Sequence, residues 1–451
     1  MDFDRLESKI RDYVRTSGIP AFAVGIVQDQ ALVFAGGYGN VKRDGGGEYV
    51  TPDTIFPSCS TAKPLTGSMI MKLSEEGLLE LDRPVVEYLP WLEYPEGGDV
   101  SQVTLRHLLT HTSGLSSDPE FPPRFFRDGF ESLRDHVRID IPGYKAIASP
   151  GQVFWYSNPG INIAGYIAEC RTGKNFAKLI KEVILAPASM NATSFDAMVN
   201  TEHMVEVEEA APSHIPPMPY PAGGAVTTVR DLARFAISQM NDGALPHGKL
   251  LDAATVNQMH TIHADSYSRP PRWYGLAFTI DFHSGRKLVS HGGGGFGCGS
   301  TFVMVPEQKT AIIALFNHPA GYGVRATNIL DEILGPGANF DAKPEKRGQM
   351  DMFAGTYYSV WPTDDYPAEI VIECSKDSIQ VTCAGQAQML TLWNDTVFLT
   401  EDRKTTVGFV TGGRYLMYEN FGIGLVSAWP YRKVNSFASS PESPVSDREK
   451  L

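Results

Sequence analysis

The sequence lacks any run of about 20 consecutive apolar residues, the length that an α-helix needs to span a lipid bilayer. The chain starts with the residues MDFDRL, which are already charged and lack the apolar stretch of a signal peptide. We therefore expect no membrane association and a cytoplasmic location.

Basic side chains are fewer than acidic ones. The chain has 39 lysines and arginines against 52 aspartates and glutamates, which gives a formal net charge of -13. Nucleic acids and anionic membrane surfaces attract proteins through clustered positive charge. The acidic balance therefore argues against either as a general partner of this protein.

Cysteine is scarce, with five residues that lie far apart in the sequence. An odd, scattered set fits a reducing compartment better than a disulfide-bonded secreted domain. Cys374 and Cys383 flank a predicted turn, but that hairpin puts Cys374 opposite Ile379, so we expect no disulfide between them. Cys59 is predicted to be a buried structural thiol.

What the chain does have is length and apolar content. Its 451 residues, 42% of them apolar, suffice for two or three domains with buried cores. Apolar residues at helical spacing predict an amphipathic helix over residues 2–16. Alternating and apolar runs predict strands at residues 21–27, 31–35, 274–280, 287–290, 301–305 and 311–316.

The composition changes at residues 336–348, which are predicted to be a linker. Beyond it, residues 349–435 contain short alternating segments that predict a small antiparallel barrel. The polar tail at 436–451 is predicted to be disordered. Residues 116–149 are irregular and rich in phenylalanine, which fits either a lid or substrate wall, or a helical insertion that packs on itself.

The stretch STAK, from Ser60 to Lys63, precedes a run of apolar residues with helical spacing. Ser60 and Lys63 would then lie one turn apart at the start of a helix, with their side chains on the same side. A serine hydroxyl is a weak nucleophile until a base takes its proton, and a desolvated lysine can be that base. A helix cap followed by a surface lysine is the alternative.

Two further stretches carry polar residues at short spacing. Tyr156 and Asn158 are two apart, so an extended or looped backbone puts both side chains on one face. A tyrosine there could move a proton and an asparagine could hold a carbonyl, whereas a buried aromatic beside a turn asparagine is the alternative. His291 is followed by a glycine-rich connection between two predicted strands, where a substrate could approach the backbone closely.

His107 and His111 lie four residues apart, which is the spacing of two metal ligands on one helix face. No glutamate follows in the pattern of a zinc protease, and no third ligand is evident. Structural hydrogen bonding is therefore the preferred interpretation of both histidines, and we predict no metal site.

Three separated motifs occur in the order and at the spacing of one family. They are Ser60-x-x-Lys63, Tyr156-x-Asn158 and His291-x-Gly293. Together with the segments that connect them, over residues 5–335, they resemble the serine β-lactamase and penicillin-binding-protein superfamily, in its class C β-lactamase-related branch.

The resemblance implies an α+β fold, that is, an antiparallel sheet flanked by helices. A β-lactamase/transpeptidase-like catalytic domain would occupy residues 1–335 and include a helical subdomain at about 62–220. The barrel at 349–435 is similar to the lipocalin-like domains of several branches. No metal or organic cofactor is implied.

Family roles can be assigned to the matching positions. Ser60 matches the acylated nucleophile, and Lys63 matches the base that activates it. Tyr156 matches the residue that relays a proton to the leaving group or from the acceptor. Asn158 matches a contact to the substrate amide. The resemblance thus implies a covalent acyl-enzyme.

The third motif departs from the commonest family pattern, because His291 stands where a lysine is usual. Histidine is mostly neutral near pH 7 and is a weaker partner for a substrate carboxylate. Gly293 and Gly294 are predicted to line the substrate site. The backbone N–H groups of Ser60 and Gly294 would then form the oxyanion hole.

These features predict a serine hydrolase or acyltransferase that acts on an ester, thioester or amide of a small molecule or peptide. The acyl group could be bound to a carrier protein or to coenzyme A. A peptide-cyclising thioesterase and a D-stereospecific peptidase remain open within the same superfamily. A sensor that is acylated but does not turn over is the alternative from another class.

Overall fold

The computed structural model describes most of the chain, and the statements below concern these residues. They are residues 3–96, 98–116, 132–196, 198–199, 202–207, 220–267, 272–295, 297–335, 353–359, 368–374, 379–392, 397–400, 405–410, 415–420 and 429–433. The predicted linker, the tail and the phenylalanines of the predicted lid lie outside these ranges. Two compact units result: one of residues 1–266 and 270–340, and one of residues 267–269 and 341–451.

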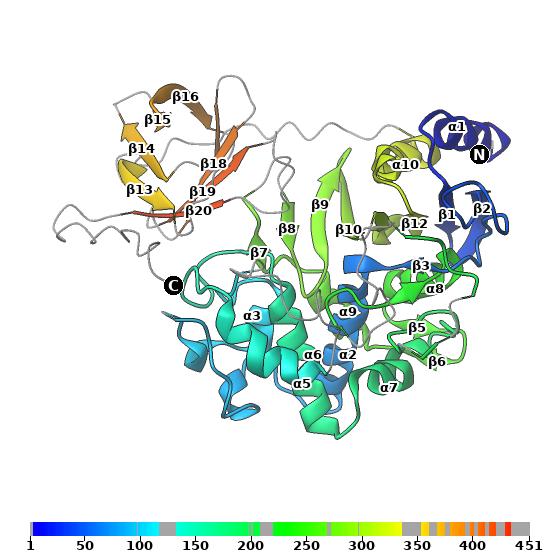
Figure 1. Cartoon of the computed structure of the whole chain (residues 1–451), viewed down its shortest axis with the longest axis horizontal. Coiled ribbons are helices and arrows are strands. Elements are labelled where there is room, and N and C mark those ends of the chain that lie inside the picture. Colours follow the sequence, from blue (N-terminus) through cyan, green and yellow to red (C-terminus); the bar gives the residue numbers. More distant parts are fainter. Residues whose placement is uncertain are drawn as a thin grey trace. The chain divides into compact units, whose positions relative to one another are not determined.

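The larger unit is organised around one eight-stranded antiparallel sheet (Figure 1). The strand order is β2-β1-β12-β11-β10-β9-β8-β7. The bounds are β1 Ala21–Gln28, β2 Ala31–Gly39, β7 Ala264–Asp265, β8 Arg272–Tyr274, β9 Thr279–His283, β10 Arg286–Gly295, β11 Cys298–Val305 and β12 Thr310–Phe316. β1 pairs with β12, in the register Phe22 to Phe316, so the first and last strands of this sheet in chain order are neighbours, next to the edge strand β2.

Helices cover both faces of this sheet. The α-helices are α1 Phe3–Thr16, α2 Ala62–Glu75, α3 Leu105–Leu109, α5 Leu133–Asp135, α6 Asn158–Thr172, α7 Phe176–Ile180, α8 Val229–Met240, α9 Ala253–Met259 and α10 Ala326–Leu334. The short helical turns are η1 Cys59–Thr61, η2 Val85–Glu87, η3 Val100–Gln102, η4 His136–Asp140, η5 Ile141–Gly143, η6 Lys181–Leu185, η7 Pro306–Gln308 and η8 Pro319–Gly323. Two-stranded ladders join β3 Phe56–Pro57 to β4 Val226–Thr227, and β5 Ala244–Leu245 to β6 Gly248–Lys249.

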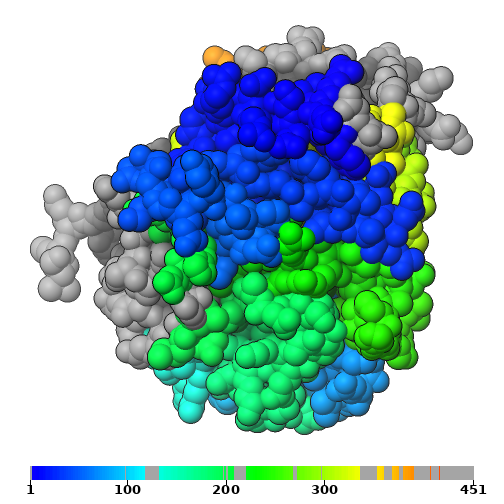
Figure 2. Space-filling model, turned by 90° about the vertical axis from the view of Figure 1, so that its right-hand side faces the viewer, coloured from blue at the N-terminus to red at the C-terminus, as the bar shows by residue number. Residues whose placement is uncertain are grey.

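Strand β1 shows how the core divides into two layers. Phe22, Val24 and Ile26 point to the face that α1 and α10 cover, and the residues between them point to the opposite face. The second face packs against α2, α6, α8 and the other helices of the helical region. The expected helix at residues 2–16 is α1, and the segment from α1 to β2, in blue, runs across one face of the unit (Figure 2).

Two expectations about strands need correction. The predicted strand at 274–280 is in fact the end of β8 and the start of β9, separated by a turn in which Ala277 has a φ of 63°. The glycine-rich stretch after His291 is not a connection but the end of β10, where Gly292 to Gly295 pair with Thr301 to Cys298 of β11. Glycine has a low intrinsic preference for β-strands. The strand conformation of Gly292 to Gly295 therefore depends on their pairing with β11.

The smaller unit is a closed antiparallel barrel of eight strands. Their bounds are β13 Gly355–Ser359, β14 Glu369–Cys374, β15 Ile379–Cys383, β16 Gln386–Leu392, β17 Val397–Thr400, β18 Thr405–Val410, β19 Tyr415–Asn420 and β20 Trp429–Lys433. Each strand pairs with the next, and β13 pairs with β20. Cys374 pairs with Ile379 as predicted. The likeness to lipocalins stays a prediction.

Across the described part of the chain, no helix has the length and apolar character needed to cross a membrane.

Candidate active site

Ser60 lies in the turn η1, which leads directly into α2. The preceding residue, Cys59, adopts a left-handed backbone with a φ of 48°, so the chain turns sharply out of β3. The carbonyl of Ser58 accepts hydrogen bonds from Thr61 Oγ1, at 2.7 Å, and from Ser300 Oγ of β11. These bonds tie the turn to the sheet and leave the Ser60 side chain partly accessible to solvent.

Lys63 lies one turn after Ser60, and its side chain is completely buried. Its Nζ is 2.8 Å from Ser60 Oγ and donates to the carbonyl oxygen of Ala222 at 2.7 Å. Burial lowers the pKa of Lys63 well below its usual value, with a smaller opposing effect from Cys59. Among the described residues no carboxylate forms an ion pair with this amine, so the neutral form is favoured.

The carbonyl that holds Lys63 is itself fixed by a buried side chain. The N–H of Ala222 donates to Asn162 Oδ1 of α6 at 3.1 Å. Asn162 Nδ2 in turn lies 3.0 Å from His136 Nε2. Neither Asn162 nor Ala222 belongs to the three predicted motifs, although the sequence around Ala222 is one of the stretches that resemble the family.

Tyr156 lies just before α6, whose first turn is capped by Ser157: the Ser157 Oγ accepts from the N–H of Gly160 at 3.2 Å. Lys63 Nζ is 4.7 Å from the centroid of the Tyr156 ring. Burial raises the pKa of Tyr156, and a hydrogen bond with Ser60 opposes this effect. The phenol is therefore protonated when Lys63 is neutral.

His291 lies on β10 and is 3% exposed. Its Nε2 is 2.8 Å from the hydroxyl of Tyr274, and its Nδ1 is 2.6 Å from the carbonyl oxygen of Gly292. A carbonyl can only accept, so Nδ1 carries the proton and Nε2 accepts from Tyr274. Burial and the nearby Lys63 lower the pKa of His291 to about 3. The imidazole is neutral and both of its nitrogens are occupied.

The two predicted glycines lie at the end of β10. A Cβ atom on Gly293 would be 2.7 Å from the backbone nitrogen of Ser60, so β10 passes directly beside the nucleophile. The carbonyl oxygen of Gly293 accepts from the hydroxyl of Tyr322 at 2.8 Å. Gly294 is exposed and pairs with Gly299. Its role in an oxyanion hole stays a prediction.

Ser60, Lys63, Tyr156 and His291 are thus brought together by direct contacts or ring packing. Asn158 is the first residue of α6, half-buried and two residues beyond Tyr156. Tyr274 and Tyr322 were not anticipated as partners of the third motif. Each is one aromatic residue in an unremarkable stretch, and only the folded sheet brings it to β10.

The two histidines with metal-ligand spacing make separate hydrogen bonds. His107 Nδ1 accepts from the N–H of Thr104 at 3.2 Å, as part of a capping box at the start of α3. His111 Nδ1 accepts from the N–H of Ser157 at 3.0 Å. Within the described ranges, no group of three or more His, Cys, Asp or Glu side chains is arranged to hold a metal ion.

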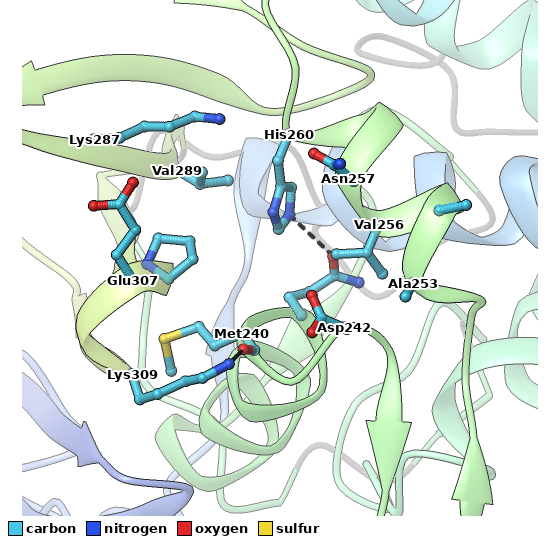
Figure 3. A pocket seen from close by; sticks show the side chains of 13 residues that line it. Met240, Asp242, Ala253, Val256, Asn257, His260, Lys287, Val289, Glu307 and Lys309 are labelled. Carbon is cyan, nitrogen blue, oxygen red and sulfur yellow. Dashed lines mark hydrogen bonds between the residues drawn. The ribbon is translucent and has the colours of Figure 1, made fainter.

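A cavity of about 480 Å³ contains none of the predicted site residues. It lies between α8, α9, the start of β10 and η7 (Figure 3). Lys287, Glu307 and Lys309 line it, and Lys309 donates to the carbonyl of Met240. Burial lowers the pKa of Lys287, and Glu307 opposes this effect. The nucleophile candidate is therefore not in this cavity.

Comparison with known proteins agrees with the geometry. The sequence model of the Beta-lactamase family matches residues 6–333, and the chain belongs to this family of serine hydrolases. Penicillin-binding protein 4 of Amycolatopsis lactamdurans is 28% identical over 385 residues, which are 79% of this chain and 98% of that protein. Unguisins hydrolase ungD' of Aspergillus campestris is 26% identical over 352 residues, 73% of this chain but only 64% of that protein.

Among solved structures, SurE with D-Leu superimposes with a TM-score of 0.69 at 21% identity, covering 96% of this chain and 99% of that chain. This likeness concerns the fold alone. It confirms the predicted combination of helices with antiparallel sheets.

Proposed function

We propose that this protein is a serine hydrolase or acyltransferase that forms an acyl-enzyme on Ser60. The observation that carries the proposal is the 2.8 Å separation between Ser60 Oγ and Nζ of the fully buried Lys63. A buried, neutral amine at hydrogen-bond distance from a hydroxyl can take its proton during attack on a carbonyl carbon. The acyl donor would be an ester, thioester or amide of a small molecule or peptide.

The directions of the two pKa changes support one division of the proton transfers between Lys63 and Tyr156. Because the pKa of Lys63 is lowered and that of Tyr156 is raised, the neutral amine and the neutral phenol coexist. Lys63 therefore accepts the Ser60 proton, and Tyr156 donates a proton to the departing group. Water, an amine or an alcohol then attacks the acyl-enzyme, and the same two side chains return the protons to their starting positions.

The backbone beside Ser60 would stabilise the negative charge of the tetrahedral intermediate. The N–H groups of Ser60 and Gly294 are the proposed donors, since β10 runs against the Ser60 backbone at Gly293. Loss of one such donor costs about 100- to 1,000-fold in rate in other enzymes. The partly accessible position of Ser60 leaves room for an external carbonyl.

The neutral state of His291 narrows the substrate class. Both of its ring nitrogens are engaged within the protein, so this position offers no cation to a substrate carboxylate. We therefore propose substrates in which the part of the molecule facing His291 carries no free carboxylate.

A D-stereospecific peptidase is the second candidate within this chemistry. One relative is named a hydrolase of unguisins, and one solved structure of the same fold contains D-Leu. Rates of p-nitroanilide release from D-leucine and L-leucine derivatives would test this candidate. A preference of at least about tenfold for the D form, lost in Ser60→Ala, supports it, and equal rates or an L preference would exclude it.

The main test is intact-mass analysis after incubation with a fluorophosphonate and, separately, with p-nitrophenyl acetate. Wild type, Ser60→Ala and Ser74→Ala would be compared. Ser74 is a matched control because it lies near the far end of α2, 14 residues after Ser60, or about 20 Å away at 1.5 Å per residue. We expect one adduct in wild type and in Ser74→Ala, and none in Ser60→Ala.

Each outcome distinguishes one class of function. One adduct with steady ester turnover supports the hydrolase or acyltransferase. An adduct without turnover supports a sensor or an enzyme that lacks its acceptor, and addition of amines or alcohols separates these two. If folded wild-type protein forms no adduct, the proposal that Ser60 is the nucleophile is wrong.

A further inference from the structure

His111 has no role in the proposed mechanism, yet its position is unusual. It lies two residues after the end of α3, is completely buried and has a left-handed backbone with a φ of 57°. Such a backbone costs a non-glycine residue on the order of 1 to 3 kcal/mol, which the surrounding structure must offset. A residue held in this way at the edge of a candidate site merits a functional explanation.

His111 forms hydrogen bonds with the two residues that flank Tyr156 in the chain. The N–H of Trp155 donates to the carbonyl oxygen of His111 at 2.7 Å. The N–H of Ser157 donates to His111 Nδ1 at 3.0 Å. The residue between these two donors is Tyr156. A single residue therefore fixes the backbone on both sides of the proposed proton relay.

The His111 ring also packs directly against that relay. Its centroid is 4.4 Å from the Tyr156 ring and 4.7 Å from the Tyr274 ring. Tyr274 is the residue whose hydroxyl donates to His291. His111 therefore lies between the two tyrosines that reach the second and third motifs, and it limits the sideways movement of both rings.

The protonation state of His111 is set by the same contact. Because Nδ1 accepts from an N–H, the ring proton is on Nε2 and the imidazole is neutral. Nε2 is buried and has no hydrogen-bond partner among the described residues. An unpaired buried donor costs about 1 to 3 kcal/mol, so packing alone would favour a residue without it.

We propose that His111 is a positioning residue that holds Tyr156 in line with Ser60 and Lys63 by fixing the chain on either side of it. The inference rests on the proposed function, because it concerns the relay of that reaction. A misplacement of a catalytic group by about 1 Å can cost about 100-fold in rate. His111 itself touches no reacting atom in this proposal.

The test compares variants that separate the hydrogen bond from the ring. His111→Asn keeps an acceptor near Nδ1 and tolerates a positive φ, whereas His111→Phe keeps a ring and loses the acceptor. Fluorophosphonate titration counts the active sites, and p-nitrophenyl acetate turnover is then expressed per labelled site. We expect His111→Phe to lose about 100-fold in kcat per labelled site with KM nearly unchanged, and His111→Asn to lose less than tenfold.

A purely structural role would lower the labelled fraction and the urea midpoint but leave kcat per labelled site unchanged. That result, within threefold of wild type, would overturn the proposal. A second readout uses the Tyr156→Phe background, where the effect of His111→Phe on the labelling rate should shrink severalfold. An undiminished effect there would show that His111 acts on something other than Tyr156.

A replacement variant and a spectroscopic measurement complete the test. If His111→Phe does not fold, the smaller His111→Leu takes its place, since it also lacks the acceptor. Nitrogen-15 spectra should show signals from unprotonated, hydrogen-bonded Nδ1 atoms of several histidines, among them His107 and His111. One of these signals should disappear in His111→Asn while that of His107 remains, and a spectrum that loses no such signal would count against the proposal. Wild type that is not labelled at Ser60 would instead contradict the proposed function.

Discussion

At the scale of single residues, Lys63 differs from Lys72, the other lysine of α2. It is completely buried between Ser60 and the carbonyl of Ala222, whereas Lys72 is partly exposed and pairs with Glu75 at 3.1 Å. Burial of an amine disfavours the charged form, and an acidic partner favours it. Burial without an acidic partner therefore favours the neutral form of Lys63.

Lys63→Arg should abolish most acylation, because a guanidinium cannot lose its proton and so cannot act as the base. We expect the labelling rate to fall about 100- to 10,000-fold, the range over which a general base contributes. Lys72→Arg, on the same helix, should label like the wild type. Stopped-flow or quenched labelling with a fluorophosphonate measures both rates.

The pH profile of the same reaction gives an independent check. The pKa of Lys63 is lowered, so labelling should persist well below the usual lysine pKa and decline only as pH falls through this lowered value. Lys63→Gln should be slow and should lose that dependence. A Lys63→Arg variant that labels at the wild-type rate would mean that another group is the base.

At the scale of elements, the end of β10 decides how closely the sheet approaches the nucleophile. A Cβ on Gly293 would be 2.6 Å from Ser300 Oγ, 2.7 Å from Ser60 N and 2.8 Å from Ser58 O. Two of these atoms are backbone and cannot rotate away. The neighbouring Gly292 is exposed, and a Cβ there would meet nothing closer than 3.9 Å.

Gly293→Ala should therefore push β10 and η1 apart, whereas Gly292→Ala should be tolerated. We expect the acylation rate of Gly293→Ala to fall about 100-fold, since a displacement near 1 Å at a reacting group has that effect. Gly292→Ala should stay within a few-fold of the wild type. Labelling rates with matched circular dichroism spectra would measure this, and equal rates for the two variants would contradict the close approach.

The same elements show how far sequence reasoning reaches. Leu6, Ile10 and Val14 repeat every four residues, and this local pattern was enough to predict α1. The run after Lys63 likewise predicted α2, and Gly77, with a φ of 71°, lies just past its end. Such features depend on neighbours in the sequence, so the sequence alone can supply them.

Features that depend on distant pairing were missed. The glycines after His291 are a strand only because β11 pairs with them, and no local pattern predicts that. β13 was not predicted, and it is held in the barrel by its pairing with the distant strand β20 at Trp429–Lys433. The bond from Tyr274 to His291 joins residues 17 positions apart and likewise depends on the folded sheet.

At the scale of the whole molecule, the larger unit buries several histidines in their neutral form. His260 is 6% exposed, packs edge-on against Phe278 and lies 3.2 Å, through Nε2, from Gln239 Oε1. Burial, with a smaller effect of Lys287, lowers its pKa to about 3. His291 has a similarly lowered value. In mild acid these histidines therefore bind protons in the unfolded chain but not in the folded one.

This proton exclusion should make the fold sensitive to mild acid. Between a folded pKa of about 3 and an unfolded value of 6.5, the unfolded state binds the proton and the folded state does not. The free energy of unfolding therefore falls as pH drops below 6.5. One such histidine lowers it by about 2 kcal/mol between pH 7 and pH 5.

His260→Gln keeps hydrogen-bonding capacity but cannot titrate, so its urea midpoint should fall less than that of the wild type between pH 7 and pH 5. The difference in unfolding free energy should be about 2 kcal/mol smaller across this interval. His247→Gln is the matched control, because His247 is exposed between β5 and β6. If both variants lose as much unfolding free energy as the wild type over this interval, proton uptake at His260 does not cause the acid sensitivity. Another buried group must then account for it, and His291 would be tested first.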